Sequence, residues 1–183
     1  MKYLKIVGML VLLSGFMSCN KSSEKNKQSG TESGWKLLKE NGYSIEYPGD
    51  WDLNKPSQLG PSFFLFSQLS SPEDKFKENV NLIIQDLKNQ NINLDKYVEI
   101  SEGQIKSLLT NGTIIESKKI EIIGIEYQKV IYTGSQGLYN LKFEQYYFVD
   151  NEKAYVLTLA CEASEFDNYK KTGEKIMNSF KLE

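Results

Sequence analysis

The feature that most restricts the fold is a run of four strand-like segments in the second half of the chain, joined by very short turns. The segments are Thr113–Ile123, Ile125–Thr133, Leu138–Val149 and Lys153–Cys161, and the turns are Gly124, Ser135-Gln136-Gly137 and Asp150-Asn151-Glu152. Parallel neighbours need a crossover of about a dozen residues or more, whereas antiparallel neighbours need only a tight turn. Strands this close together in sequence therefore predict an antiparallel sheet.

The first half of the chain adds strand signals of the same kind. Glu40-Asn41-Gly42 separates two alternating runs, Trp35–Leu38 and Tyr43–Tyr47. Asn-Gly between such runs predicts a hairpin turn in which both central residues have positive φ. Phe63–Leu69 and Val80–Leu87 predict two more strands, so we expect about six to eight strands altogether.

Two segments have a helical period instead. The first is expected to begin at Leu94 and to end at Asn111-Gly112, with one stripe made of Leu94, Tyr97, Val98, Ile105, Leu108 and Leu109. The second follows Ser164, its expected N-cap, and presents one face made of Phe166, Tyr169, Gly173, Ile176, Met177 and Phe180. Two helices packed on a mostly antiparallel sheet predict an α+β layered domain.

Aromatic residues are concentrated on the central strands of this predicted sheet. In the segment Leu138–Val149, alternation places Tyr139, Leu141, Phe143 and Gln145 on one face and Asn140, Lys142, Glu144 and Tyr146 on the other. This is the pattern of a sheet with one buried face, so we interpret the aromatic residues as core residues. An exposed aromatic patch would instead indicate a protein interface.

The composition excludes several kinds of chemistry. The 183-residue chain contains no histidine, and all 22 of its basic residues are lysines. Without histidine there is no Ser-His-Asp triad, Cys-His dyad or His-ligated zinc site, and without arginine there is no bidentate phosphate clamp. The formal net charge of −2 also disfavours a polyanionic partner. We therefore expect no cofactor and no nucleic-acid partner.

The N-terminus has the organisation of an export signal. Lys2 and Lys5 give the chain a basic start, and an uncharged, mostly apolar run, Ile6–Met17, follows them. At about 12 residues, this run is too short to span a bilayer core. Ser18 and Cys19 follow. The segment resembles the bacterial lipoprotein signal family, in which a small residue precedes the cysteine that is lipidated; its relaxed lipobox is similar to those of Bacteroidetes-type lipoproteins. An ordinary secretory signal with cleavage near Ser18 is the alternative.

These signals divide the chain into three expected parts: a signal peptide at residues 1–18, the lipidated Cys19 with a polar tether at 19–34, and one α+β domain at 35–183. The tether has no large apolar side chain to offset the cost of ordering, and its average reach is about 20 Å. The diacylglyceryl group of lipoproteins supplies the two acyl chains that stable anchoring needs. We therefore expect Cys19 to attach the chain to a membrane in the bacterial cell envelope, at the outer membrane.

Two motifs of the domain resemble the PsbP-like family. Tyr43-Ser44-Ile45-Glu46-Tyr47-Pro48-Gly49-Asp50-Trp51 is similar to the family's opening strand with its Tyr-Pro-x-x-Trp ending, and Tyr155–Ala160 followed by Phe166–Phe180 is similar to its closing strand and helix. The resemblance covers about Trp35 to Glu183 and implies an α/β/α sandwich, an antiparallel sheet between helices. It implies no reaction, because characterised members mostly stabilise or regulate partner proteins. Histidine metal ligands known in the family have no counterpart in this chain.

Three groups of side chains are chemical candidates. Cys161 ends an apolar strand without a histidine to activate it, so a buried structural thiol is favoured over a nucleophile. Asp50 and Asp52, like Asp150-Asn151-Glu152, offer oxygen ligands, but neither group has the ligand spacing of an EF-type loop. Turn formation is therefore favoured over calcium binding. We expect no catalytic residues and no metal site.

We predict a non-enzymatic envelope lipoprotein whose domain docks or stabilises a protein partner. The alternative is a small-ligand-binding module with a pocket at the sheet–helix junction near Tyr47 and Trp51, which we take as a candidate binding surface. A cavity with converging polar groups would favour ligand binding. A flat aromatic patch rimmed by lysine and glutamate would favour docking. An enzyme is the third alternative.

Overall fold

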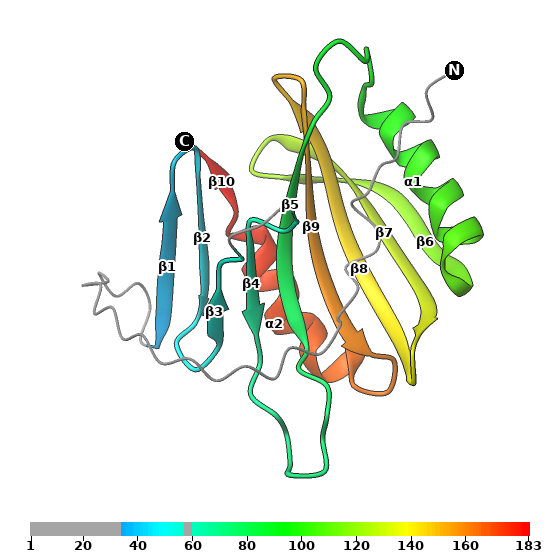
Figure 1. The fold of residues 1–183 in the computed structure, drawn as a ribbon. Coiled ribbons are helices and arrows are strands. Elements are labelled where there is room, and N and C mark those ends of the chain that lie inside the picture. Colours follow the sequence, from blue (N-terminus) through cyan, green and yellow to red (C-terminus); the bar gives the residue numbers. More distant parts are fainter. Residues whose placement is uncertain (1–33, 57–59) are drawn as a thin grey trace.

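The computed structural model describes residues 34–56 and 60–183 (Figure 1). The expected signal peptide, Cys19 and the tether up to residue 33 lie outside the described residues. The elements are, in order, β1 (Trp35–Glu40), β2 (Tyr43–Pro48), β3 (Asp52–Asn54), β4 (Phe63–Phe66), β5 (Asn79–Asp86), α1 (Leu94–Leu108), β6 (Thr110–Ile122), β7 (Ile125–Gln136), β8 (Tyr139–Asp150), β9 (Lys153–Glu162), α2 (Phe166–Asn178) and β10 (Lys181–Leu182).

The described strands form two antiparallel sheets, as the short turns predict. One has three strands in the order β1-β2-β10, and the other has seven in the order β3-β4-β5-β9-β8-β7-β6. The predicted run of four strands is present as β6 to β9, each of them paired with its sequence neighbour. The sequence pattern does not predict β3 and β10, because two or three residues are too few to show alternation. The α+β class is confirmed.

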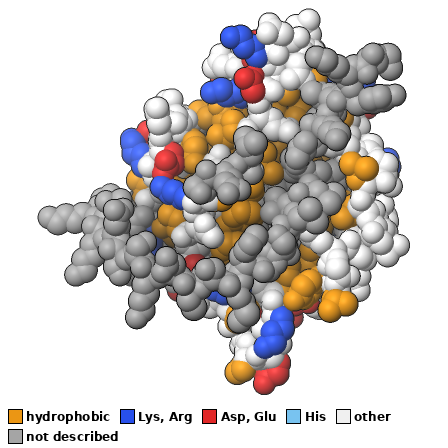
Figure 2. Space-filling view, in the orientation of Figure 1, with side chains coloured by type: hydrophobic (Ala, Val, Ile, Leu, Met, Phe, Trp, Pro, Cys, Tyr) orange, Lys and Arg blue, Asp and Glu red, His pale blue; other side chains and the backbone are white. Residues whose placement is uncertain are grey.

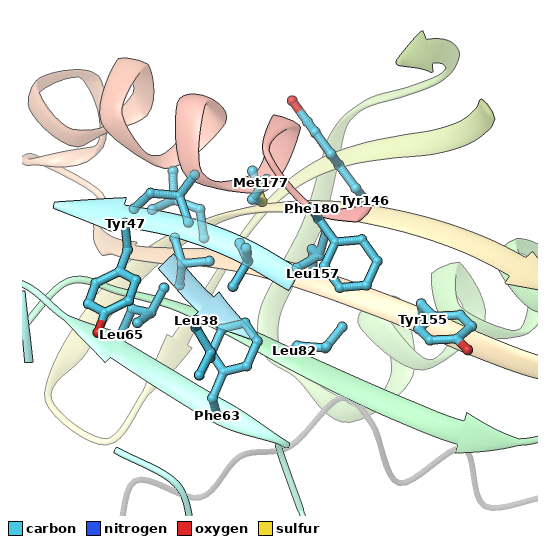
Figure 3. Close-up of a cluster of buried hydrophobic side chains, with 14 of the residues drawn as sticks. Leu38, Tyr47, Phe63, Leu65, Leu82, Tyr146, Tyr155, Leu157, Met177 and Phe180 are labelled. Atoms are coloured by element: carbon cyan, nitrogen blue, oxygen red, sulfur yellow. The ribbon is translucent and has the colours of Figure 1, made fainter. Parts of the chain in front are cut away.

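The two helices cover opposite faces of the seven-stranded sheet. The sheet separates two hydrophobic cores, and neighbouring residues of β9 belong to different cores. Leu157 belongs to the core on the α2 side, and Val156 belongs to the core on the α1 side. Side chains that alternate along a strand point to opposite faces, so α1 and α2 pack on different sides of the sheet. Figure 3 shows Met177 of α2 and the following Phe180 lying close to Leu157 in the first core.

Strand β8 is buried on both faces, so the expectation of a single buried face is wrong. Leu141 and Gln145 are buried on the α1 face, and Glu144 and Tyr146 are buried on the α2 face. The alternation of polar and apolar residues is real, but a helix or loop covers each side of the strand. The buried polar side chains of β8 are therefore paired within the protein, Gln145 with Thr158 and Glu144 with Lys129.

The helix boundaries follow local signals with two exceptions. The side chain of Asn93 caps α1 by accepting a 2.9 Å hydrogen bond from the backbone N–H of Lys96. Leu108, expected on the buried stripe, is exposed because it is the last residue of α1, where the chain turns into β6. Glu165, without a side-chain cap, precedes α2, so the prediction of Ser164 as N-cap is wrong.

The turn at Asn41-Gly42 has a different geometry from the expected one. The hairpin forms, with Glu40 opposite Tyr43, but only Gly42 has positive φ, at 100°. Two positive φ angles occur instead in the β6–β7 turn, at Ile123 (52°) and Gly124 (77°). Left-handed backbone is sterically unfavourable for a β-branched residue, so Ile123 is locally strained.

Candidate binding pocket

A pocket of about 220 Å³ lies on the α1 face of the seven-stranded sheet. It is bordered by the end of α1 and by the last residues of β7 with the turn that follows them. Its floor is formed by β5, β9 and β8, and Phe64 and Phe76 close it from the side of β4. The lining residues are Phe64, Phe76, Asn79, Asn81, Ile83, Leu108, Leu109, Thr110, Tyr132, Ser135, Gln136, Gly137, Leu141, Phe143, Gln145, Thr158 and Ala160.

The floor of the pocket carries a row of polar side chains across three neighbouring strands. Asn81 of β5 lies opposite Thr158 of β9, and Thr158 lies opposite Gln145 of β8. Asn79 lies two residues before Asn81 on the same face of β5. All four side chains are buried. Buried amides on a sheet face are costly unless they are hydrogen-bonded, so this row distinguishes the pocket from the surrounding core. We call the site the amide pocket.

Hydrogen bonds fix these polar side chains in place but do not use their full capacity. Nε2 of Gln145 donates to Oγ1 of Thr158 at 2.9 Å, and Oε1 of Gln145 accepts from the hydroxyl of Tyr147. Nδ2 of Asn81 donates to Oδ1 of Asn79 at 3.2 Å. Each amide has two N–H donors and a carbonyl acceptor, and a threonine hydroxyl both donates and accepts. The floor is therefore pre-organised to hydrogen-bond a ligand.

The walls of the amide pocket are uncharged and combine apolar residues with the polar residues Thr110, Ser135 and Gln136. Leu109, Leu141 and Phe143 contribute aliphatic and aromatic surface, and Phe143 stacks on Tyr132 with 4.8 Å between the ring centroids. Burial raises the pKa of Tyr132 far above its usual range, so its hydroxyl is neutral at physiological pH. No Asp, Glu or Lys is among the lining residues in the described part of the chain. This arrangement suits a ligand that combines apolar surface with neutral hydrogen-bonding groups.

Tyr47 and Trp51, which the sequence indicates as candidate binding residues, lie elsewhere. Both are buried in the core on the α2 side, with 2% and 6% of their surface exposed. Trp51 packs in a T-shaped arrangement against Tyr169 of α2, with 6.3 Å between ring centroids. The pocket does lie at a sheet–helix junction, but at the end of α1 and not beside these two residues. Their binding role stays a prediction and would require exposure of buried side chains.

The other chemical candidates are occupied with structural contacts. Cys161 is fully buried, and burial with nearby carboxylates, Glu78 first among them, raises the pKa of its thiol far above the usual range. Asp52 forms an ion pair with Lys77 at 2.9 Å. Asp150 accepts a 2.8 Å hydrogen bond from the side chain of Asn151 in the β8–β9 turn. Among residues 34–56 and 60–183 there is no cluster of three or more metal-ligating side chains.

A buried ion cluster lies on the α2 face, on the side of the sheet opposite the amide pocket. Nζ of Lys129 in β7 lies 2.7 Å from Oε1 of Glu144 and 2.9 Å from Oε1 of Glu174. Glu144 is fully buried, whereas the side chain of Glu174 is 30% exposed. Burial raises the pKa of Glu144 despite the opposing effect of Lys129. For Glu174, burial is outweighed by its hydrogen bond and charge interaction with Lys129, and its pKa is lowered.

Sequence reasoning missed both the amide pocket and the ion cluster. Asn79, Asn81, Gln145 and Thr158 come from three strands, and only the register of those strands brings them into adjoining rows. One signal was available: polar amides and a hydroxyl at alternate positions of otherwise apolar strands. That signal is indistinguishable from a solvated strand face until the covering elements are known.

Comparison with protein families supports the sequence resemblance. The family model described as PsbP-like protein matches residues 4–182. A search of curated proteins finds no match. Within the described ranges, no helix has the length and apolar character needed to cross a bilayer.

Solved structures share the fold at low sequence identity. Cyanobacterial PsbP (CyanoP) from Synechocystis sp. PCC 6803 aligns with 15% identity and a TM-score of 0.57 over 86% of this chain and 98% of its own. The Pseudomonas aeruginosa protein PA94, of unknown function and described as a putative regulator, aligns with 14% identity and a TM-score of 0.55 over 80% and 96%. LpqN of Mycobacterium tuberculosis, described as involved in cell envelope biogenesis, aligns with 14% identity and a TM-score of 0.54 over 81% and 90%.

Proposed function

The chain belongs to the PsbP-like protein family, and from this premise we propose that it is a non-enzymatic, lipid-anchored protein of the cell envelope whose domain binds a small uncharged ligand in the amide pocket. The observation that carries the proposal is the row of buried polar side chains, Asn81, Thr158 and Gln145, at the floor of a pocket whose lining is uncharged. Converging polar groups of this kind favour ligand binding over a flat docking surface.

The lining of the amide pocket sets the chemical class of the ligand. A charged ligand would lose its hydration on entry and find no countercharge among the lining residues of the described chain. A purely apolar ligand would leave the amides of Asn81 and Gln145 without new partners. The pocket therefore favours a neutral molecule with at least one hydrogen-bonding group and an aromatic or aliphatic part to contact Phe64 and Phe143.

The envelope location and the absence of catalysis rest on sequence features. Ser18-Cys19 after the apolar run supports lipidation at Cys19, and the description of LpqN as involved in cell envelope biogenesis fits an envelope location. The chain has no histidine, and its second cysteine, Cys161, is buried with a raised thiol pKa. These features support a binding role instead of nucleophilic or general base catalysis.

The anchor is tested by metabolic labelling of the full chain with a fatty-acid analogue. The label should be lost in Cys19→Ala and kept in Cys161→Ala, which is the matched control because these are the two cysteines of the chain. A label that persists in Cys19→Ala would refute lipidation at this residue. Secretion of mature protein that begins at another residue would refute it as well.

The pocket is tested with two fluorescent probes that differ by one charged group. N-phenyl-1-naphthylamine is uncharged, and 1-anilinonaphthalene-8-sulfonate carries the same rings with an added sulfonate. We expect the neutral probe to bind at least about tenfold more tightly, because the sulfonate would be desolvated without a countercharge. Equal affinity for the two probes would contradict the proposed ligand class.

Two variants locate the probe. Ala160 lies in the pocket lining, so Ala160→Leu should fill part of the space and weaken binding of the neutral probe. Ala163→Leu, at an exposed position just beyond β9, is the matched control and should leave binding unchanged. Undiminished probe binding by folded Ala160→Leu protein would place the probe outside the amide pocket.

Docking of a protein partner is a second candidate, favoured by one observation at the β6–β7 turn. Ile123 is 78% exposed and has the strained positive φ of 52°, although a glycine or asparagine would fit this turn better. A photo-crosslinking amino acid at position 123 should capture a specific envelope protein in intact cells. The same group at Lys171, an exposed residue of α2, is the control. Equal crosslinking at both positions would refute docking through this turn.

A further inference from the structure

Three exposed leucines lie around one end of the domain. Leu69 in the β4–β5 loop is 43% exposed, Leu108 at the end of α1 is 61% exposed, and Leu138 in the β7–β8 turn is 100% exposed. Single exposed leucines are common in proteins, but here three separate elements bring one each to the same end. Figure 2 shows hydrophobic side chains reaching the surface at this lower end. We call Leu69, Leu108 and Leu138 the leucine rim.

Contacts between the three elements show that the leucine rim is one region. Leu108 and Gly137, the neighbour of Leu138, line the same pocket. Phe76 of the β4–β5 loop packs on Tyr139 with 5.2 Å between ring centroids, and the Tyr139 hydroxyl donates to the carbonyl oxygen of Lys75 at 3.3 Å. The β4–β5 loop, the β7–β8 turn and the end of α1 therefore surround the mouth of the amide pocket.

The described chain begins at this same end. The backbone N–H of Gly49 donates to the carbonyl oxygen of Gly34 at 2.6 Å. Nε2 of Gln68, the residue before Leu69, donates to the carbonyl oxygen of Asp50 at 2.6 Å. Figure 1 shows the start of β1, the β4–β5 loop and the β7–β8 turn all toward the lower end of the molecule, from left to right. A segment that attaches Gly34 to a membrane would therefore hold this end toward it.

We propose that the leucine rim is a membrane contact surface that turns the mouth of the amide pocket toward the bilayer. The inference rests on the proposed function in one respect: the lipid at Cys19 attaches the chain to the membrane. An anchor at Cys19, 15 residues before Gly34 in the sequence, would keep the domain close to the lipid interface. Transfer of exposed leucine side chains from water into that interface is favourable. It therefore favours the orientation in which the leucine rim faces the bilayer.

The other exposed apolar turn cannot share this contact. Ile123 and Leu138 are in the turns at opposite ends of β7, a strand of 12 residues. At a rise of roughly 3.3 Å per residue, about 40 Å of strand lies between these two turns. When the rim touches the bilayer, Ile123 therefore remains in water. This makes the two positions a matched pair of exposed, apolar turn residues.

The test uses an environment-sensitive fluorophore attached to Leu138→Cys or Ile123→Cys in the chain from residue 19 onward. Cys19 is replaced by serine, and an N-terminal histidine tag attaches the chain to phosphatidylcholine vesicles that contain a nickel-chelating lipid. This attachment replaces the native anchor. The remaining thiol, Cys161, is fully buried and does not compete for the label. Quenchers carried on the lipid acyl chains then report contact with the bilayer.

We expect lipid quenching of the label at position 138 to exceed that at position 123 at least about threefold, and this difference should persist in high salt because the contact is apolar. Leu69→Asp with Leu108→Asp should reduce the quenching at position 138. Equal quenching at the two positions, or stronger quenching at position 123, would overturn the proposal. If Cys19 takes up no fatty-acid label in cells, the proposed native anchor is refuted. The vesicle measurement is unaffected by that result, because the histidine tag supplies the attachment.

Discussion

Replacement of Lys129 by methionine should destabilise the domain strongly, because it leaves the Glu144 carboxylate buried without a countercharge. In the native protein, Nζ of Lys129 is shared by Glu144 at 2.7 Å and Glu174 at 2.9 Å. The side chain of Glu174 is 30% exposed and can be hydrated after the substitution. Glu144 has no exposed surface and cannot. The cost therefore falls on Glu144.

The magnitude follows from this difference in burial. Removal of one partner from a buried ion pair typically costs about 3–5 kcal/mol, whereas loss of an exposed pair costs about 0–1 kcal/mol. We expect Lys129→Met to fall in the first range. Lys170→Met is the matched control, because Lys170 lies 3.8 Å from the same Glu174 but has a side chain that is 41% exposed. It should fall in the second range.

The destabilisation should depend on pH in a defined direction. Burial already raises the pKa of Glu144, and loss of Lys129 removes the group that opposes this rise. A folded-state pKa above the unfolded value means that the folded state binds the proton more tightly. Its stabilising effect is complete below the unfolded pKa and is lost as pH rises through the folded pKa. The cost of Lys129→Met should therefore shrink between pH 7 and pH 5.

Urea unfolding of four proteins tests this reasoning at both pH values: the parent, Lys129→Met, Glu144→Met and the double variant. The double variant carries no stranded charge, so it should be more stable than Lys129→Met by about 2 kcal/mol or more, and its stability should lack the added pH dependence. A cost below about 1 kcal/mol for Lys129→Met, with no change between pH 7 and pH 5, would refute the assignment of a buried charge to Glu144.

Three further predictions can be checked on the purified protein. Gly112→Ala should lower the free energy of unfolding in urea by about 2 kcal/mol, because the added Cβ would lie 2.1 Å from the carbonyl oxygen of Ile105. Gly103→Ala is the contrasting variant: Gly103 lies in α1 with open space around it, so alanine should raise the free energy of unfolding by about 0.5–1 kcal/mol. Cys161 should resist iodoacetamide in native protein and react in urea; rapid native reaction would contradict its burial. Ile123→Asn should raise the free energy of unfolding by about 1 kcal/mol, because asparagine tolerates the positive φ at this position with less strain. A loss of stability would instead show that the Ile123 side chain contributes to the fold.

Much of the strand and helix content was predictable because it depends on local chemistry. The four segments from Thr113 to Cys161 are joined by turns too short for a crossover, so their antiparallel order followed from chain connectivity alone. Local signals also placed α1 and α2 close to their observed ranges. Some errors are local, namely the Ser164 cap and the Asn41-Gly42 turn, and others concern side chains whose environment is set by the rest of the fold. Leu108 was expected to be buried and is exposed, and Glu144 was expected on an open face and is fully buried.

By itself, the sequence determined the α+β class, the antiparallel run of β6 to β9, the family resemblance and the absence of histidine and arginine chemistry. Only the tertiary structure decided that Asn81, Thr158 and Gln145 share a pocket floor and that Lys129 neutralises Glu144. Strand periodicity states which residues share a face of one strand, but it does not state which strands become neighbours or what covers the face. Those depend on the register of residues far apart in the chain, which no local pattern encodes.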